Sequence, residues 1–235
     1  YYGTQGWVSH STGNIWGHTV PGDDTLRGLY PSGAAWHCRH LWEHYAFGGD
    51  KSYLETKGYP IMKEAAEFWL ENMVEYQKHF IIAPSVSAEH GVEMKNGSPV
   101  DYSTANGEQT AGRIFTLPAY QDIEMVYDLY THVIKASECL GIDSAFREKV
   151  AIARNKLLPL KIGRYGQLQE WIDDVDNPRD HHRHIAHLYA LYPGNMISYS
   201  QTPALALAVK KSLEMRGKGK FGERWPHTGG NWSMA

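Results

Sequence analysis

Apolar residues recur at helical spacing along most of this chain. Between residues 60 and 77, for example, Ile61, Ala65 and Phe68 fall on one face of a helix that Pro60 is well placed to begin. Glycines follow several of these apolar segments, which is typical of helix ends. The helices predicted in this way cover residues 34–47, 51–57, 60–77, 118–140, 144–158, 184–192 and 203–215.

Long polar loops separate the predicted helices, and strands are nearly absent. Only residues 79–84 are short, apolar and β-prone enough to predict an extended segment. The first thirty residues and residues 85–116 are loop-like, and loops of this length in a compact domain usually have a function. Paired helices joined by polar loops favour an all-α fold of stacked helical hairpins, with residues 1–235 as a single domain.

The composition indicates a globular protein and argues against two classes of partner. The chain has 235 residues, of which 42% are hydrophobic and 21% charged, so it can bury a sizeable core. A formal net charge of −3 gives no electrostatic footprint for nucleic acid, and no apolar run is long enough to span a membrane. Eight tryptophans and 15 tyrosines suit either a helical core or the faces of sugar rings.

The early loop, residues 6–17, is the first candidate for chemistry. It places His10, Asn14 and Trp16 within a few residues of one another, as a binding site for a polar ligand would require. A tryptophan-anchored loop with Asn14 in a turn explains the same residues without any function.

Glu89 is the candidate general acid. It follows the apolar segment 79–84 and opens the longest loop, within the stretch PSVSAEH of residues 84–90. A carboxylic acid in such a place can be partly desolvated, which raises its pKa and suits proton donation to a leaving group. A solvated loop glutamate is the alternative.

The third candidate combines Glu170 and Trp171 with the histidine-rich stretch that follows. His184 and His187 lie one turn apart in the predicted helix 184–192, and the four residues suit the polar wall of a ligand pocket. Surface histidines that cap a helix, or a metal site, are alternatives. No cysteine or securely placed third ligand accompanies these histidines.

A zinc-peptidase pattern, H-x-x-E-H, occurs at His40, Glu43 and His44. On a helix the two histidines share a face, and Glu43 is placed to act on a zinc-bound water. The pattern is short, and the neighbouring Leu41 and Trp42 are typical of an amphipathic helix core, so a chance match is the alternative.

Several stretches in collinear order resemble glycoside hydrolase family 95, the 1,2-α-L-fucosidases. They are residues 6–17, 31–36, 41–45, 84–89, 166–171, 182–188 and 192–194. The resemblance implies an (α/α)6 barrel as the catalytic domain. We therefore expect residues 1–235 to form a fragment of that barrel, incomplete at its C-terminus and without the family's flanking β-domains.

The resemblance also implies an exo-acting enzyme that releases terminal α-L-fucose from an oligosaccharide, with inversion at the anomeric carbon. Glu89 matches the family's general acid, and Asn14 matches the asparagine that holds the attacking water with the help of a carboxylate. The sugar pocket would be lined by His10, Thr12, Trp16, Glu170, Trp171, His184 and His187. No cofactor or metal is implied, and the family carries no zinc at the helix that holds the H-x-x-E-H pattern.

Two departures from the family pattern bear on the activity. Thr12 replaces a second asparagine, and Lys218 stands where the supporting acid is expected, in an altered loop in which Glu223 is the nearest substitute. These changes leave open an α-L-galactosidase or a non-catalytic carbohydrate-binding toroid. The resemblance further implies a bacterial protein that is secreted or periplasmic.

Overall fold

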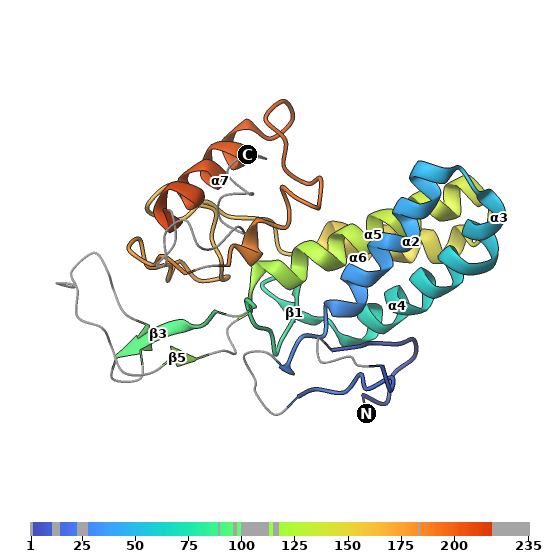
Figure 1. Ribbon diagram of the computed structural model, residues 1–235, viewed down its shortest axis with the longest axis horizontal. Helices are drawn as coiled ribbons and strands as arrows, with labels where there is room; N and C mark the ends of the chain where they lie inside the picture. Colours follow the sequence, from blue (N-terminus) through green and yellow to red (C-terminus); the bar gives the residue numbers. More distant parts are fainter. Residues whose placement is uncertain are drawn as a thin grey trace. The chain divides into compact units, whose positions relative to one another are not determined.

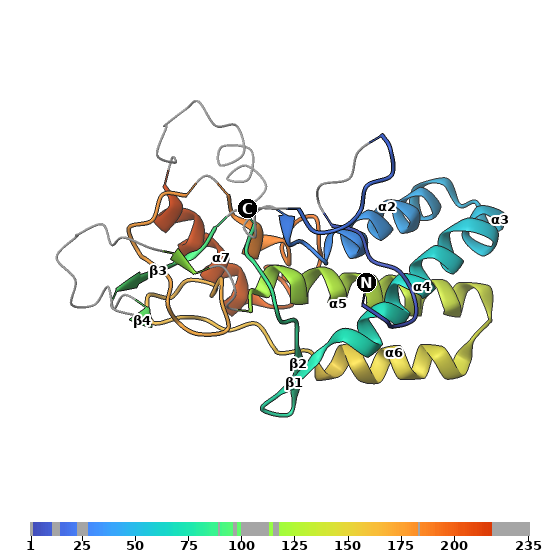
Figure 2. The same cartoon turned by 90° about the horizontal axis from the view of Figure 1, so that it is seen from below.

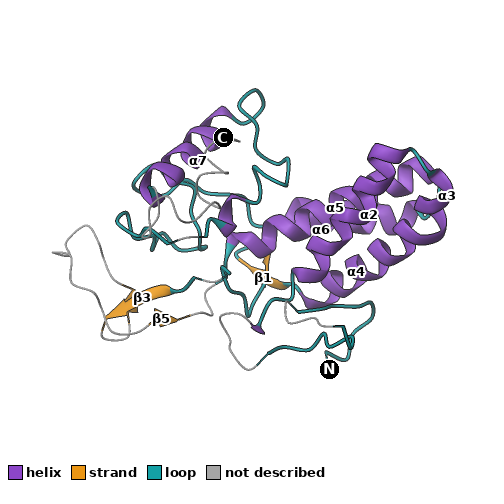
Figure 3. Cartoon of the chain, viewed as in Figure 1, coloured by secondary structure: helices purple, strands orange, loops and turns teal. Residues whose placement is uncertain are grey.

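The computed structural model describes residues 2–10, 15–22, 28–88, 90–95, 98–99, 113–114, 118–182 and 184–217. Helices dominate this part of the chain (Figures 1 and 3), which confirms the all-α class, while the closed barrel stays a prediction. The α-helices are α2 (Gly33–Gly48), α3 (Lys51–Tyr53), α4 (Tyr59–Asn72), α5 (Tyr120–Leu140), α6 (Ser144–Lys156) and α7 (Pro203–Arg216). The strands are β1 (Val74–Tyr76), β2 (His79–Ile81), β3 (Val92–Lys95), β4 (Ser98–Pro99) and β5 (Arg113–Ile114).

The chain forms two compact units. The first comprises Tyr1–Ala83 with Met125–Leu158, and the second comprises Pro84–Glu124 with Pro159–Ala235. The beginning of α5 therefore belongs to the second unit and the rest of that helix to the first. The single domain expected over residues 1–235 stays a prediction.

The first unit consists mainly of two helical hairpins. The chain passes from α2 to α4 through α3 and a π-helical turn, Leu54–Gly58, and α5 returns to α6 through residues 141–143. These four long helices lie side by side (Figure 2), with α4 in contact with both α2 and α6. The largest side chains fully buried in this unit include those of Leu54, Met62, Trp69, Leu129 and Tyr130. The predicted pairing of helices is thus confirmed locally.

A short hairpin explains why the helix predicted over residues 60–77 ends early, at Asn72. Strand β1 pairs antiparallel with β2, and Gln77 and Lys78 form the connecting turn with φ values of 49° and 71°. Two consecutive residues with positive φ are typical of a tight hairpin turn. The extended segment predicted over residues 79–84 is confirmed as β2.

Gly6 lets the N-terminal segment cross α4 at close range. Its φ is 77°, and a Cβ atom there would lie 2.1 Å from Glu64 O and 2.6 Å from Phe68 N. The next residue, Trp7, donates its indole N–H to Ile61 O at 2.9 Å. Only glycine combines this backbone angle with so close an approach, so Gly6 fixes where the early loop begins.

The second unit has its hydrophobic core along one side of α7. Ala208, Val209 and Leu213 of that helix pack against the loop residues Leu168, Leu188, Ala190 and Ile197. Within residues 85–116, where only loop was predicted, three strands form an antiparallel sheet in the order β4-β3-β5.

The helix predicted over residues 184–192 is wrong. This segment forms a 3-10 turn, Ala186–Leu188, followed by further turns in which Leu191 N–H bonds to Leu188 O. Ala190 N–H bonds to Glu124 Oε2 at 3.1 Å, and His184 O accepts from Arg216 Nε at 3.3 Å. Other segments thus take up backbone groups that a regular helix would pair within itself.

Arg39 of α2 takes part in two ion pairs that differ in burial. Its Nη1 lies 2.8 Å from Asp128 Oδ2 of α5, and its Nε lies 2.8 Å from Glu43 Oε1 of the same helix. The Asp128 side chain is 3% exposed and that of Glu43 is 37% exposed. Arg39 therefore pairs with one buried carboxylate, that of Asp128, and with one largely solvated carboxylate, that of Glu43.

We expect Asp128→Asn to destabilise the protein much more than Glu43→Gln. Asp128→Asn removes the buried partner of Arg39 and leaves its guanidinium paired only with the largely solvated Glu43 carboxylate, which costs up to about 3 kcal/mol. A largely solvated pair contributes less than about 1 kcal/mol. Thermal unfolding of the two variants measures the difference, and equal shifts in Tm would show that burial of the Asp128 pair is not what matters.

Candidate functional site

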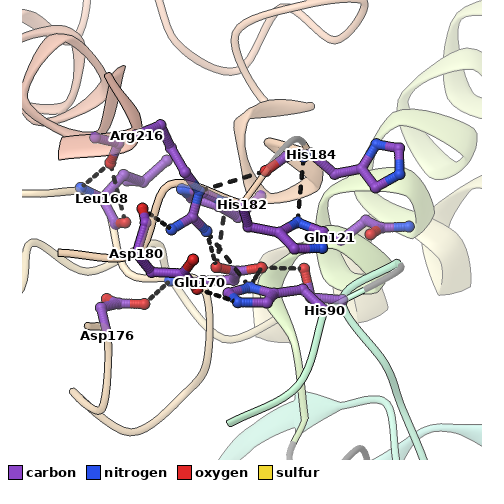
Figure 4. Close-up of polar contacts among 12 residues, drawn as sticks. His90, Gln121, Leu168, Glu170, Asp176, Asp180, His182, His184 and Arg216 are labelled. Atoms are coloured by element: carbon purple, nitrogen blue, oxygen red, sulfur yellow. Dashed lines mark hydrogen bonds and ion pairs between the residues drawn. The ribbon is translucent and has the colours of Figure 1, made fainter. Parts of the chain in front are cut away.

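A buried carboxylate, that of Glu170, is the centre of a polar cluster in the second unit (Figure 4). Its Oε1 accepts hydrogen bonds from Ser87 Oγ at 2.6 Å and from His90 Nδ1 at 3.0 Å, and its Oε2 accepts one from Arg216 Nη2 at 2.5 Å. The other ring nitrogen of His90 bonds to Asp180 Oδ2. We call Ser87, His90, Glu170, Asp180 and Arg216 the Glu170 cluster.

The charges within the Glu170 cluster compensate one another. Burial opposes ionisation of Glu170, but the positive charges of His90 and Arg216 outweigh it and hold the pKa of Glu170 well below its usual range. Burial also opposes a charge on His90, whereas Glu170 and Asp180 raise the pKa of that imidazole. Burial would raise the pKa of Asp180, but the bond to His90 lowers it to about 2. Two carboxylates thus face an imidazolium and a guanidinium, which is the balance that buried charges require.

Arg216, the last residue of α7, connects the cluster to two loop positions. Its Nε donates to His184 O at 3.3 Å and its Nη1 donates to Asp180 O at 3.4 Å. The helix ends at this point because Gly217 adopts a φ of 58°, and its N–H bonds back to Leu213 O. The end of α7 therefore sets where the guanidinium lies.

Asp176 is a third acid beside Glu170. Its Oδ2 accepts from Gln167 Nε2 at 2.7 Å, and its Oδ1 accepts from the backbone N–H of Glu170 at 3.2 Å. Burial and the negative charge of Glu170 raise the pKa of Asp176 to about 7. The carboxyl group of Asp176 is therefore protonated at pH values below about 7.

A row of imidazole rings extends from the cluster. The His182 ring stacks on the His90 ring with centroids 4.4 Å apart and planes 17° apart, and the His184 ring lies 5.4 Å from that of His182. Burial lowers the pKa of His182 to about 3, and the charge of His90 acts in the same direction. Burial also lowers the pKa of His187 to about 4. Neutral imidazoles both donate and accept hydrogen bonds, which suits the hydroxyl groups of an uncharged ligand.

The structure brings together the four predicted site residues of the second unit that it describes, Glu170, Trp171, His184 and His187. His187 Nδ1 lies 3.8 Å from Glu170 Oε2, and His184 is connected to the cluster through its backbone oxygen. Trp171, only 4% exposed, packs against Val92 and Ala119 as part of a small hydrophobic core. Trp171 and Glu170 thus support this region from inside.

The other predicted residues belong to the first unit or lie outside the described residues. His10 is buried in the first unit, where its Nδ1 accepts the backbone N–H of Tyr30 at 2.9 Å and its Nε2 contacts Tyr2 Oη at 2.9 Å. Trp16, in the same unit, is 84% exposed. The positions outside the described residues are Thr12, Asn14, Glu89, Lys218 and Glu223.

Sequence reasoning missed most of the Glu170 cluster. His90 and Asp180 bond to each other across 90 residues of chain, and Arg216 reaches Glu170 from 46 residues away. No local pattern indicates contacts of that separation. The one available signal was position, since His90 directly follows the candidate acid Glu89.

The zinc-peptidase pattern finds no support in the structure. Glu43 pairs with Arg39, and the His44 ring packs against Tyr53 with centroids 4.0 Å apart. Among the residues that the structure describes, no group of three or more His, Cys, Asp or Glu side chains is arranged to hold a metal ion. In the same part of the chain, no helix is long and apolar enough to cross a membrane.

We expect the stability of the protein to fall, relative to an Asp176→Asn variant, as the pH rises from about 4 to about 7. An unfolded aspartate has a pKa of about 4, so the raised pKa of Asp176 in the fold gives stability that is lost as the carboxyl ionises. The measurement is Tm against pH for both proteins. A constant difference in Tm across this range would contradict the proposed ionisation.

Comparison with known proteins identifies the family of the chain. The model of the glycosyl hydrolase family 95 catalytic domain matches residues 1–235. Alpha-L-fucosidase 2 of Arabidopsis thaliana is 34% identical over 237 residues, covering 100% of this chain and 26% of the relative. Probable alpha-fucosidase A of Aspergillus niger is 33% identical over 227 residues, covering 93% of this chain and 26% of the relative.

The chain thus spans about a quarter of the length of these relatives. They are plant and fungal proteins, so the bacterial origin expected from the resemblance is withdrawn. The match over the whole chain confirms the resemblance found in the sequence. The chain belongs to glycosyl hydrolase family 95.

Proposed function

We propose that this chain is the catalytic part of an exo-acting, inverting α-L-fucosidase. The observation that carries the proposal is the Glu170 cluster, which holds the residues on both sides of Glu89 in a buried, charge-balanced site. The fucosidase names of the relatives support the substrate class. A neutral sugar also suits the neutral imidazoles of His182 and His187 better than an anionic ligand does.

In the proposed reaction, Glu89 donates its proton to the glycosidic oxygen as the bond from that oxygen to the anomeric carbon breaks. A water molecule held by Asn14 attacks the anomeric carbon from the opposite face and loses a proton to a supporting carboxylate. The products are β-L-fucose and the shortened glycan. Inverting enzymes keep their two catalytic groups roughly 6.5–9.5 Å apart so that this water fits.

Glu223 is the proposed supporting carboxylate, because Lys218 occupies the position where the family has an acid. An amide is too weak a base to activate water alone, so the reaction needs a carboxylate that draws the proton away through Asn14. Thr12, two residues before Asn14 in the sequence, is proposed to offer its hydroxyl to the same water or to a sugar hydroxyl.

The proposed sugar pocket has contact residues and supporting residues. His184 and His187, together with Thr12 and Trp16 of the early loop, are the proposed contacts. His10 is buried with both ring nitrogens bonded to protein groups, so we propose that it supports the early loop and does not touch the sugar. Glu170 has both oxygens engaged by protein groups and Trp171 is packed in the core, so we propose that these two hold the pocket wall in place. An exo-acting enzyme needs only one such pocket, shaped for a terminal sugar.

We expect Glu89→Gln in the whole protein to lower turnover of an α-L-fucosyl oligosaccharide by at least about 10²-fold while L-fucose still binds. Loss of the proton donor removes acid assistance but leaves the pocket intact. Steady-state kinetics and calorimetric titration with L-fucose measure the two effects. Glu148→Gln, an exposed glutamate of α6, is the matched control and should turn over normally. Unchanged turnover in Glu89→Gln would remove this residue from the mechanism.

We expect the first product formed from a nitrophenyl α-L-fucoside to be β-L-fucose, because a single displacement inverts the anomeric carbon. Proton NMR during the first minutes of reaction distinguishes the two anomers. The matching α-L-galactoside, which differs only at carbon 6, tests the sugar preference. Initial release of α-L-fucose would exclude inversion, and binding of both glycosides without hydrolysis would identify a carbohydrate-binding protein instead.

A further inference from the structure

The segment that leads to the proposed acid is anchored at two points. On its N-terminal side, Ser85 Oγ accepts the backbone N–H of Ala119 at 3.0 Å. Within the turn, the backbone N–H of Ala88 donates to Gln121 Oε1 at 2.9 Å. Both partners lie at the start of α5, within the second unit, so the segment before Glu89 is fixed to the beginning of a helix.

Ser87 and His90 bind the same oxygen atom. Ser87 Oγ and His90 Nδ1 both donate to Glu170 Oε1, at 2.6 Å and 3.0 Å, and His90 N–H bonds to Ser87 O at 2.5 Å. The only residues between them in the chain are Ala88 and Glu89. One carboxylate oxygen therefore clamps both ends of the two-residue link that contains the proposed acid.

The anchor itself cannot easily move. Glu170 is 2% exposed, its second oxygen is held by Arg216, and its backbone N–H is bound by Asp176. His90 is held a second time by Asp180. Moving Glu170 would leave buried charges uncompensated, which is costly. The clamp is thus a rigid part of the fold.

We infer that Ser87 and His90 are positioning residues that, through Glu170, aim the carboxyl group of Glu89 at the glycosidic oxygen. This inference rests on the proposed function. A general acid must come within hydrogen-bond distance of the leaving oxygen, and a misplacement of about 1 Å can cost about 10²-fold in rate. Neither Ser87 nor His90 needs to touch the sugar for this role.

Two substrates with different leaving groups distinguish a misplaced general acid from general damage to the fold. The alcohol of an oligosaccharide is a poor leaving group that needs a proton, whereas fluoride leaves without one. A variant whose acid is misaimed should therefore lose activity on the oligosaccharide and keep activity on α-L-fucosyl fluoride. A variant with a damaged fold or pocket loses both activities together.

The first test is Ser87→Ala in the whole protein, compared with Ser137→Ala. Ser137 is a buried serine of the first unit whose hydroxyl donates to Ile142 O. Ser137→Ala therefore also removes one buried, hydrogen-bonded hydroxyl, but it leaves the contacts of Ser87 and His90 with Glu170 intact. We expect Ser87→Ala to lower kcat/KM on an α-L-fucosyl oligosaccharide by about 10- to 100-fold and on the fluoride by less than about threefold. Ser137→Ala should keep the ratio of the two rates at the wild-type value.

The second test uses two variants of His90 and covers the case in which Ser87→Ala fails to fold. In His90→Asn the amide nitrogen can take the place of Nδ1 and keep the bond to Glu170. In His90→Gln it can take the place of Nε2 and keep only the bond to Asp180. Both variants remove the same positive charge. We nevertheless expect the loss of activity on the oligosaccharide, relative to that on the fluoride, to be larger in His90→Gln than in His90→Asn.

Glu89→Gln on the same two substrates distinguishes the possible failures. If Glu89→Gln slows only the oligosaccharide, but Ser87→Ala and His90→Gln slow both substrates equally or neither, the positioning inference is overturned and the proposed acid stands. If Glu89→Gln itself shows no dependence on the leaving group, the proposed function fails.

Discussion

The arrangement of the second unit depends on one buried negative charge. Glu170 is stable as an anion only because His90 and Arg216 lie against it, and each of these comes from a segment distant in sequence. A buried carboxylate without such partners would be strongly unfavourable. The need to compensate it therefore fixes three loop regions and the end of α7 at one point, where little regular secondary structure is available to do so.

The first unit is organised by different means. Its helices pack through large apolar side chains such as Met62 and Trp69, and its hairpins close through glycine helix ends and short turns. Polar contacts such as that between Arg39 and Asp128 add to a core that packing already defines.

This contrast explains what the sequence could predict. Helices α2, α4, α5, α6 and α7 were all predicted to within about five residues, because apolar periodicity is a local signal, as are the glycines that follow α2, α5 and α7. The segment around His187 has the apolar spacing of a helix but forms turns, because distant side chains bond to its backbone, as Glu124 does to Ala190 N–H. Glu170, His184 and His187 were predicted as site residues from local patterns, and that role stays a prediction. Arg216 was not predicted, since its contact with Glu170 is one that no local pattern encodes.

Gly6 has a consequence for how natural variation in this protein should be interpreted. It bears no functional group, yet the loop that holds Thr12 and Asn14 starts from the place where Gly6 crosses α4, with no room for a methyl group. Any replacement would push the backbone away from Glu64 and displace the chain leading into that loop. Under the proposed function, a loss of activity in such an allele would come from a single steric collision on the surface of a helix and not from a lost functional group.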